Sequence, residues 1–298
     1  MPHRRNGTYG MEHYLSKLLV HRANAFRVWM GPSLVNNNIS YPACPGDVTI
    51  TTTTIITTIT TLITTVPPGT FSGPSFCTSP LILETRPRRY SLENAWRMDW
   101  VLRFSQRHGM YAHVVLDSWP QEIRNGEWNF SVFNAANGGP LALPFAMYDS
   151  TDSDVTDQWV QRLAYVGARF GAFRSVLGWE LINEPDTPYM FAPQSIKTKY
   201  PELKNFPIAK FIPWIRHLAR LMKTGDQGQH LVTTNFAGGS RMQNLTYLPE
   251  IDFLGSHDYQ YHGGATKALH TGGVASMQKR LRYAITFLRR ALLLWVLP

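Results

Sequence analysis

Residues 178–186, Gly-Trp-Glu-Leu-Ile-Asn-Glu-Pro-Asp, join an apolar run to an amide, a carboxylate and a proline. We expect Asn183 and Glu184 to stand where a buried strand ends, and in a parallel barrel that end is the mouth where catalytic residues gather. A carboxylic acid there could protonate the leaving oxygen of a glycosidic bond while a second carboxylate attacks or assists at the anomeric carbon. Glu184 is therefore a candidate general acid/base, and a structural carboxylate at the strand end is the alternative.

Four other residues are candidates for contact with a ligand. Arg27 lies within an apolar run, where a charged side chain is rare unless it faces a polar cavity or is paired. His257 and Tyr259 follow one predicted strand, and Trp119 follows another, where its ring could stack on a sugar face. The alternatives are a salt-bridged arginine, a surface histidine and two aromatic rings that only pack.

The spacing of apolar residues predicts the elements that would position these side chains. In chain order they are a helix at 11–22, a strand at 25–30, a helix at 91–108, a strand at 111–116, a helix at 159–170, a strand at 176–182, a helix at 208–224, strands at 231–234 and 251–256, and a helix at 277–288.

Strands that alternate with helices predict a parallel sheet, because parallel neighbours need a crossover connection and a helix supplies it. About five strands are visible, whereas a closed barrel has eight. An open doubly wound sheet is the alternative, but no glycine-rich phosphate loop follows the first strand. We therefore expect an α/β fold, an incomplete TIM (β/α)8 barrel that forms a single domain over residues 1–298.

One stretch interrupts this alternation. Residues 49–65 are only Thr, Ile and Leu, with high strand propensity but neither clean alternation nor turn signals. We expect a low-complexity insertion without a defined fold at about residues 38–88. A threonine-rich glycosylated stalk or a binding flap is the alternative. Cys44 and Cys77 flank the run and could form a single bridge.

The chain resembles glycoside hydrolase family 5, especially its endo-β-mannosidase-like and cellulase-like members. In that family a strand ending in Trp-Glu-x-x-Asn-Glu-Pro carries the acid/base as its last Glu, and the adjacent Asn contacts the sugar 2-hydroxyl. The matching residues are Trp179, Glu180, Asn183, Glu184 and Pro185, and further stretches with the family's look lie at 26–30, 91–97 and 134–140.

The resemblance implies a role for each candidate residue. Glu184 would be the acid/base, and Arg27 would belong to the residues that hold the nucleophile. His257 and Tyr259 would match the family's His-x-Tyr pair, which binds sugar and orients the nucleophile.

The nucleophile itself is missing on this interpretation. A retaining glycosidase needs a second carboxylate about 5–5.5 Å from the first, and the family places it at the end of the seventh strand. After Glu184 the remaining glutamates are Glu202, predicted in a loop, and Glu250, predicted before its strand. We expect a truncated chain that lacks the first and seventh strands.

Two functions stay open. The first is a glycoside hydrolase that acts on the O-glycosidic bonds of a β-linked polysaccharide, β-mannan or β-glucan, with catalysis impaired in this chain. The second is a non-catalytic carbohydrate-binding pseudoenzyme, with Arg27, Asn183, Trp119 and Tyr259 as its sugar cleft.

Composition bounds the other partners. Hydrophobic residues at 44% and charged residues at 16% favour a globular core over disorder. The formal charge of +9 could suggest nucleic acid, but ten basic residues near the ends or in the insertion account for it, and without them the charge is −1. We therefore expect a polysaccharide or oligosaccharide partner and no nucleic acid. The ten are Arg4, Arg5, Arg86, Arg88, Arg89, Lys279, Arg280, Arg282, Arg289 and Arg290.

We expect no cofactor, no metal and no membrane span. His257, Asp258 and His262 lack a convincing ligand spacing. The apolar tail at 291–298 is far shorter than the roughly 20 residues that cross a bilayer. No apolar signal core follows the basic N-terminus, so an extracellular location is implied by the resemblance alone.

Overall fold

The computed structural model describes residues 7–30, 47–55, 58–65, 83–118, 128, 131–148, 153–191, 194–237, 245 and 248–256. These residues belong to one compact unit, Met1–His257. The predicted ligand contacts Trp119, His257 and Tyr259 lie outside the described residues. So do the predicted helix at 277–288, the cysteine pair, and Asp258 and His262.

The centre of the molecule is a five-stranded parallel sheet. Its strands are β1 (Ala25–Trp29), β6 (Tyr111–Val115), β7 (Val176–Asn183), β8 (Leu231–Phe236) and β9 (Phe253–Ser256), in that spatial order. All four neighbouring pairs are parallel.

Spatial order therefore follows chain order, whereas a doubly wound sheet reverses its order at a switch point. The barrel-type prediction is confirmed for these strands, and the described part of the chain contains five of the eight strands of a closed barrel.

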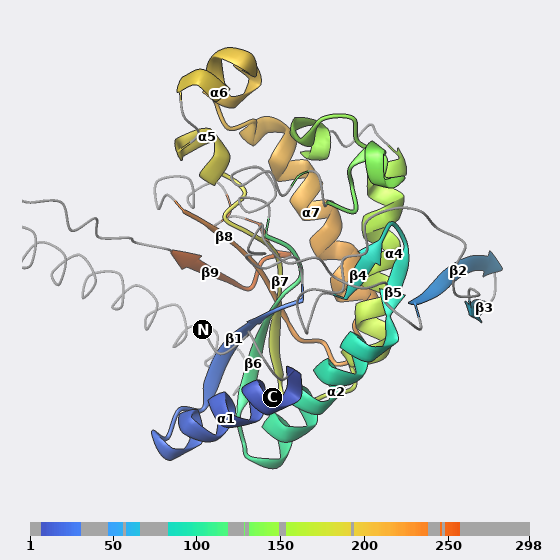
Figure 1. Cartoon of the computed structure of the whole chain (residues 1–298), viewed down its shortest axis with the longest axis vertical. Helices are drawn as coiled ribbons and strands as arrows, with labels where there is room; N and C mark the ends of the chain where they lie inside the picture. The colour runs from blue at the N-terminus through green and yellow to red at the C-terminus, as the bar shows by residue number, and fades with distance from the viewer. Residues whose placement is uncertain are drawn as a thin grey trace, which may run out of the picture. The chain divides into compact units, whose positions relative to one another are not determined.

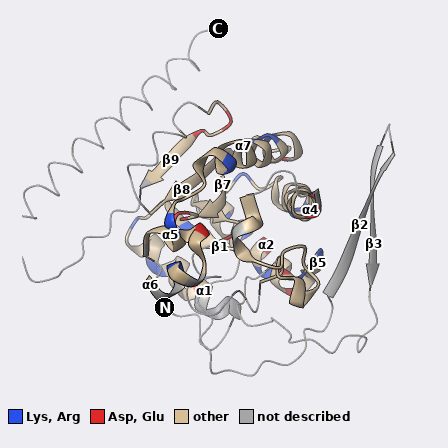
Figure 2. Cartoon of the chain, turned by 90° about the horizontal axis from the view of Figure 1, so that it is seen from above, with Lys and Arg blue, Asp and Glu red and all other residues tan. Residues whose placement is uncertain are grey.

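Helices connect the strands as predicted. The long ones are α1 (Gly7–Val20), α2 (Leu92–Arg107), α4 (Ser153–Phe170) and α7 (Ile208–Gly225). In Figures 1 and 2, α2, α4 and α7 stand along one side of the strands. Ser91 begins α2 with a side-chain cap, because its hydroxyl accepts a hydrogen bond from the backbone N–H of Asn94. Within the described residues, no helix has the length and apolar character that crossing a bilayer requires.

Short elements occupy the connections after β6 and β7. They are η2 (Ala135–Asn137), η3 (Pro144–Tyr148), α5 (Thr187–Phe191), α6 (Gln194–Lys199) and η4 (Pro201–Lys204).

A second, antiparallel sheet contains the threonine-rich run. Its order is β3 (Thr58–Thr65), β2 (Asp47–Ile55), β5 (Arg89–Ser91) and β4 (Glu84–Arg86). The structure thus differs from the expected insertion without a defined fold. The strand propensity of the β-branched residues prevails, since β2 and β3 pair from Val48 and Thr65 to Ile55 and Thr58.

Residues 83–85, near the end of the expected insertion, contact the barrel. Leu83, Glu84 and Thr85 are buried, and the carboxylate of Glu84 accepts hydrogen bonds from the side chains of Gln158 and Arg162 in α4. A buried charge must be paired to be tolerated, so these contacts attach β4 to the barrel.

The core lies between the parallel sheet and its helices, and it is rich in aromatic rings. Trp159 in α4 and Trp214 in α7 are almost completely buried and meet edge to face with their ring centroids 5.7 Å apart. Phe211 in α7 packs against Phe236 at the end of β8. These contacts hold α4 and α7 against the strand ends that carry the candidate site.

Candidate active site

The end of β7 is held between the ends of its two neighbours. The backbone N–H of Asn183 donates to the carbonyl of Asp117, which follows β6, at 2.9 Å. The backbone N–H of Glu184 donates to the carbonyl of Asn235 in β8 at 3.0 Å. The candidate pair therefore stands at the carboxyl end of the sheet, where the sequence placed it.

Glu184 has a left-handed backbone, with φ of +47°. This conformation is uncommon for a residue with a side chain, and such strain clusters at functional sites. The residue is 8% exposed, and the hydroxyl of Thr187 donates to its carboxylate at 3.3 Å. The chain thus turns sharply after β7 and places the carboxyl group at the strand end.

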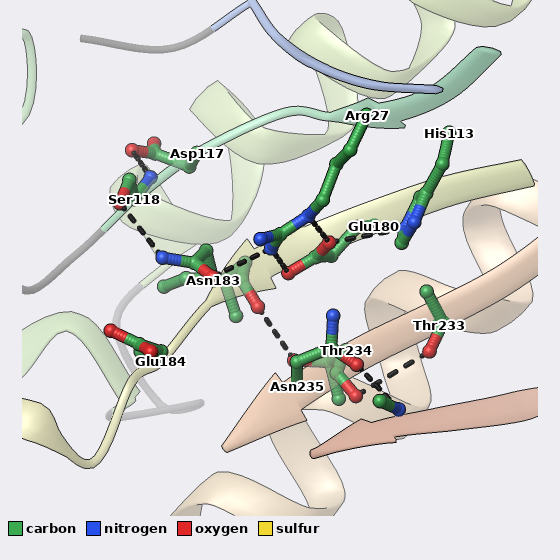
Figure 3. Close-up of polar contacts among 12 residues, drawn as sticks. Arg27, His113, Asp117, Ser118, Glu180, Asn183, Glu184, Thr233, Thr234 and Asn235 are labelled. Atoms are coloured by element: carbon green, nitrogen blue, oxygen red, sulfur yellow. Dashed lines mark hydrogen bonds and ion pairs between the residues drawn. The ribbon is translucent and has the colours of Figure 1, made fainter. Parts of the chain in front are cut away.

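Arg27, in β1, contacts two residues of β7 and an aromatic ring of its own strand. Its Nε and Nη2 atoms donate to the two carboxylate oxygens of Glu180 in β7, at 2.8 and 2.5 Å. Nη2 also donates to the side-chain oxygen of Asn183 at 2.6 Å. The guanidinium lies 4.4 Å from the centre of the Trp29 ring. The charge within the strand is thus paired with Glu180 and in contact with Asn183 (Figure 3).

Glu180 is the buried partner of this arginine. It is fully buried, and Nε2 of His113 in β6 lies 3.0 Å from Oε2, the carboxylate oxygen that also accepts the hydrogen bond from Nε of Arg27. The His113 ring packs edge to face on Phe253 of β9. Our prediction assigned no role to Glu180 or His113. The signal that selected Arg27, a charge inside an apolar strand, also applies to Glu180.

Asn183 also reaches the segment after β6. Its side-chain nitrogen donates to the hydroxyl of Ser118 at 3.2 Å, and the backbone N–H of Ser118 donates to the carboxylate of Asp117 at 2.7 Å. Ser118 is fully buried. A single serine after a strand carries no sequence signal, and only the tertiary contact identifies it.

Behind this segment lies a buried ion network. Arg162 in α4 donates to the carboxylate of Asp117 and, at 2.6 Å, to that of Glu84. Burial favours the neutral form of Arg162, but the charges of Glu84 and Asp117 outweigh this effect and raise the arginine pKa above its usual value. Arg162 is therefore a permanent cation that fixes the end of β6.

Of the two other glutamates after Glu184, Glu250 lies before its strand as predicted, whereas Glu202, predicted in a loop, lies in the short 3-10 helix η4. Glu202 is exposed in η4, and Glu250 accepts hydrogen bonds from Arg216 and Arg220 of α7 just before β9. In the described part of the chain, no group of His, Cys, Asp and Glu side chains is arranged to hold a metal ion.

Comparisons with known proteins gave similarity only among solved structures, since no protein-family model and no curated protein match the chain. A β-1,4-D-mannanase from Cryptopygus antarcticus has a TM-score of 0.48 and 12% identity, over 88% of this chain and 66% of that chain. A β-mannanase from the blue mussel Mytilus edulis has a TM-score of 0.45 and 13% identity, over 88% and 66%. A family 5 mannosidase from Rhizomucor miehei has a TM-score of 0.47 and 13% identity, over 82% of this chain and 50% of that chain.

The similar structures are thus β-mannanases and a related glycoside hydrolase. The chain spans less than two thirds of the length of each.

Proposed function

We propose that the chain is a glycoside hydrolase that acts on the O-glycosidic bonds of a β-linked polysaccharide, β-mannan or β-glucan, with Glu184 as general acid/base. One observation carries the proposal. Glu184 follows β7 on a strained backbone at the carboxyl end of the sheet, and Arg27 holds the side chain of Asn183, the residue before it. A carboxyl group at the mouth of a parallel barrel could protonate a leaving sugar oxygen, which supports the proposal.

The chemistry assigns a step to each group. Glu184 in its acid form would donate a proton to the glycosidic oxygen as the bond breaks, and as a carboxylate it would later take a proton from water. Asn183 would contact a sugar hydroxyl. A retaining mechanism also needs a nucleophilic carboxylate about 5–5.5 Å from the acid.

Glu180 is a poor candidate for that nucleophile. Both of its oxygens accept hydrogen bonds from Arg27, and the side chain is fully buried. A carboxylate in this position cannot approach an anomeric carbon without breaking the ion pair.

The Glu180 contact also favours a second candidate function, sugar binding without turnover. The resemblance assigns Arg27 to holding the nucleophile, but within the described residues the carboxylate that pairs with Arg27 is Glu180. The chain would then use Arg27 and Asn183, with Trp119 and Tyr259, as a cleft for oligosaccharides.

Release of reducing ends from β-1,4-mannan and β-glucan separates the two functions. For a hydrolase we expect Glu184→Gln to lower kcat/KM at least about 100-fold, the usual contribution of a general acid. Glu202→Gln removes an exposed carboxyl group from η4 and should leave the rate unchanged.

Each other outcome has its own meaning. Binding of β-1,4-mannan or β-glucan oligosaccharides by the wild-type chain without turnover would support the pseudoenzyme. A chain that neither cuts nor binds these sugars would contradict both functions. Where turnover occurs, the anomeric configuration of the first product, followed by NMR, tests retention, because an inverting enzyme gives the opposite anomer.

A further inference from the structure

The side-chain amide of Asn183 has two chemically different ends, and its surroundings distinguish them. A guanidinium carries only donors, so the atom that faces Nη2 of Arg27 at 2.6 Å must be the amide oxygen. Arg27 is itself held by the bidentate contact with Glu180. The amide oxygen therefore accepts its hydrogen bond from Arg27 of β1.

The nitrogen end faces Ser118. Nδ2 lies 3.2 Å from Oγ of this fully buried serine, which accepts the hydrogen bond. Ser118 is fixed in turn, because its backbone N–H donates to Asp117 and Arg162 holds the carboxylate of Asp117. In Figure 3 the amide lies between Arg27 and Ser118.

We infer that Ser118 is a positioning residue which, with Arg27, holds the Asn183 amide in one orientation, so that it presents an N–H donor to a sugar hydroxyl. The NH2 group has a second N–H, and within the described residues no contact takes it up. The ligand in this inference rests on the proposed function, whereas the fixed amide does not depend on it.

A fixed donor has a consequence for specificity. The sugar hydroxyl that meets Asn183 must accept a hydrogen bond, so an analogue with fluorine there keeps a weak acceptor and a deoxy analogue keeps none. A site that hydrogen-bonds a hydroxyl discriminates against ligands that lack it, because its own polar group is left unpaired.

The fixed amide can be tested without a ligand. The two side-chain N–H signals of Asn183 in a proton–nitrogen NMR spectrum are identified by their loss in Asn183→Asp. We expect one proton to exchange slowly with solvent, and Ser118→Ala to speed its exchange at least about fivefold, the equivalent of one net hydrogen bond. Ser105→Ala is the matched control, because it removes another fully buried hydroxyl, one that donates to a carbonyl within α2.

The donor role needs a ligand series, measured in Glu184→Gln so that the ligand is not cut. The probes are methyl β-1,4-mannobioside and its 2-fluoro and 2-deoxy analogues at the sugar whose bond would break. We expect affinity to fall from hydroxyl to fluoro to deoxy. Adding Ser118→Ala should reduce the preference for hydroxyl over deoxy about fivefold, whereas adding Ser105→Ala should preserve it.

Three results would overturn the inference, and they differ from failure of the proposed function. Exchange that Ser118→Ala leaves unchanged contradicts the fixed amide. Equal affinity for the fluoro and deoxy sugars, or a preference unaffected by Ser118→Ala, contradicts the donor role. Slow exchange in a chain that binds none of the three sugars contradicts the proposed function and, with it, the ligand named here.

Discussion

At the residue scale, the site is defined by side chains that are distant in sequence but in contact. Arg27 and Glu180 are 153 positions apart, and each is the principal charged partner of the other. Glu180 is fully buried and the Arg27 side chain is 24% exposed, so the two charges are well removed from solvent. Such a pair is costly to break, because the remaining charge has no water to stabilise it.

This pairing predicts the effect of removing one charge. Arg27→Met leaves Glu180 buried and unpaired, and we expect it to lower the free energy of unfolding by about 3 kcal/mol or more. Arg27→Met combined with Glu180→Gln should recover part of this loss, since no charge is then buried. Urea unfolding of the single and double variants measures the coupling. Strictly additive losses would contradict the ion pair.

The strained backbone of Glu184 predicts a reversal of the usual ranking of alanine and glycine. At φ of +47° a β-carbon is unfavourable, so Glu184→Gly should be more stable than Glu184→Ala by about 1 kcal/mol. At the exposed helical position 103 in α2, Arg103→Ala should instead be more stable than Arg103→Gly by about 1 kcal/mol. Thermal unfolding of the four variants measures both differences. If alanine were more stable than glycine at both positions, the backbone strain at Glu184 would be refuted.

At the element scale, a buried carboxylate after α7 joins this helix to two strands of the parallel sheet. Asp226 follows α7 and connects it to β7 and β8. Its carboxylate accepts hydrogen bonds from the indole N–H of Trp179 at 2.9 Å and from the backbone N–H of His230 at 2.8 Å. Nδ1 of the His230 ring lies 2.9 Å from the same carboxylate. Trp179, which the sequence motif included, is therefore a structural anchor below the site.

This anchor predicts acid sensitivity. Burial acts to raise the pKa of Asp226, but hydrogen bonds from His230 and Trp179 outweigh it and lower that pKa below the usual value. A depressed carboxyl pKa stabilises the fold above the unfolded-state pKa of about 4, and this stability is lost as pH falls through the folded-state pKa.

The measurement is urea unfolding at a series of pH values from 6 down to 2.5. We expect the free energy of unfolding to decline more steeply below pH 4 in the wild-type chain than in Asp226→Asn, whose amide does not titrate. Parallel curves for the two chains would show that Asp226 does not carry this dependence.

At the scale of the whole molecule, the threonine-rich hairpin is a peripheral addition to the barrel. Residues 47–49 of β2 pair with β5, whereas the described residues 50–55 and 58–63 pair only with each other. The distal hairpin is therefore separable from the elements that position the site.

Shortening the hairpin tests this separation. Replacing residues 50–63 with Asn-Gly keeps the pair Thr49 and Thr64 and supplies a favoured two-residue turn. We expect the melting temperature to change little and aggregation to decrease, because an unbroken β-branched run is prone to intermolecular pairing. A deletion that extends to residue 47 removes the partner of β5 and should destabilise the fold. Equal loss of stability in both deletions would contradict a separable hairpin.

The sequence by itself determined the order and type of the main elements. The predicted strand at 176–182 is β7 (Val176–Asn183) and the predicted helix at 208–224 is α7 (Ile208–Gly225), since apolar periodicity reports local burial. It also placed Asn183 and Glu184 at a strand end. Only the tertiary structure decided that Glu180 holds Arg27, that Ser118 meets the Asn183 amide, and that the threonine-rich run pairs as a hairpin. These contacts join residues through strand register and packing, which no local window of sequence contains.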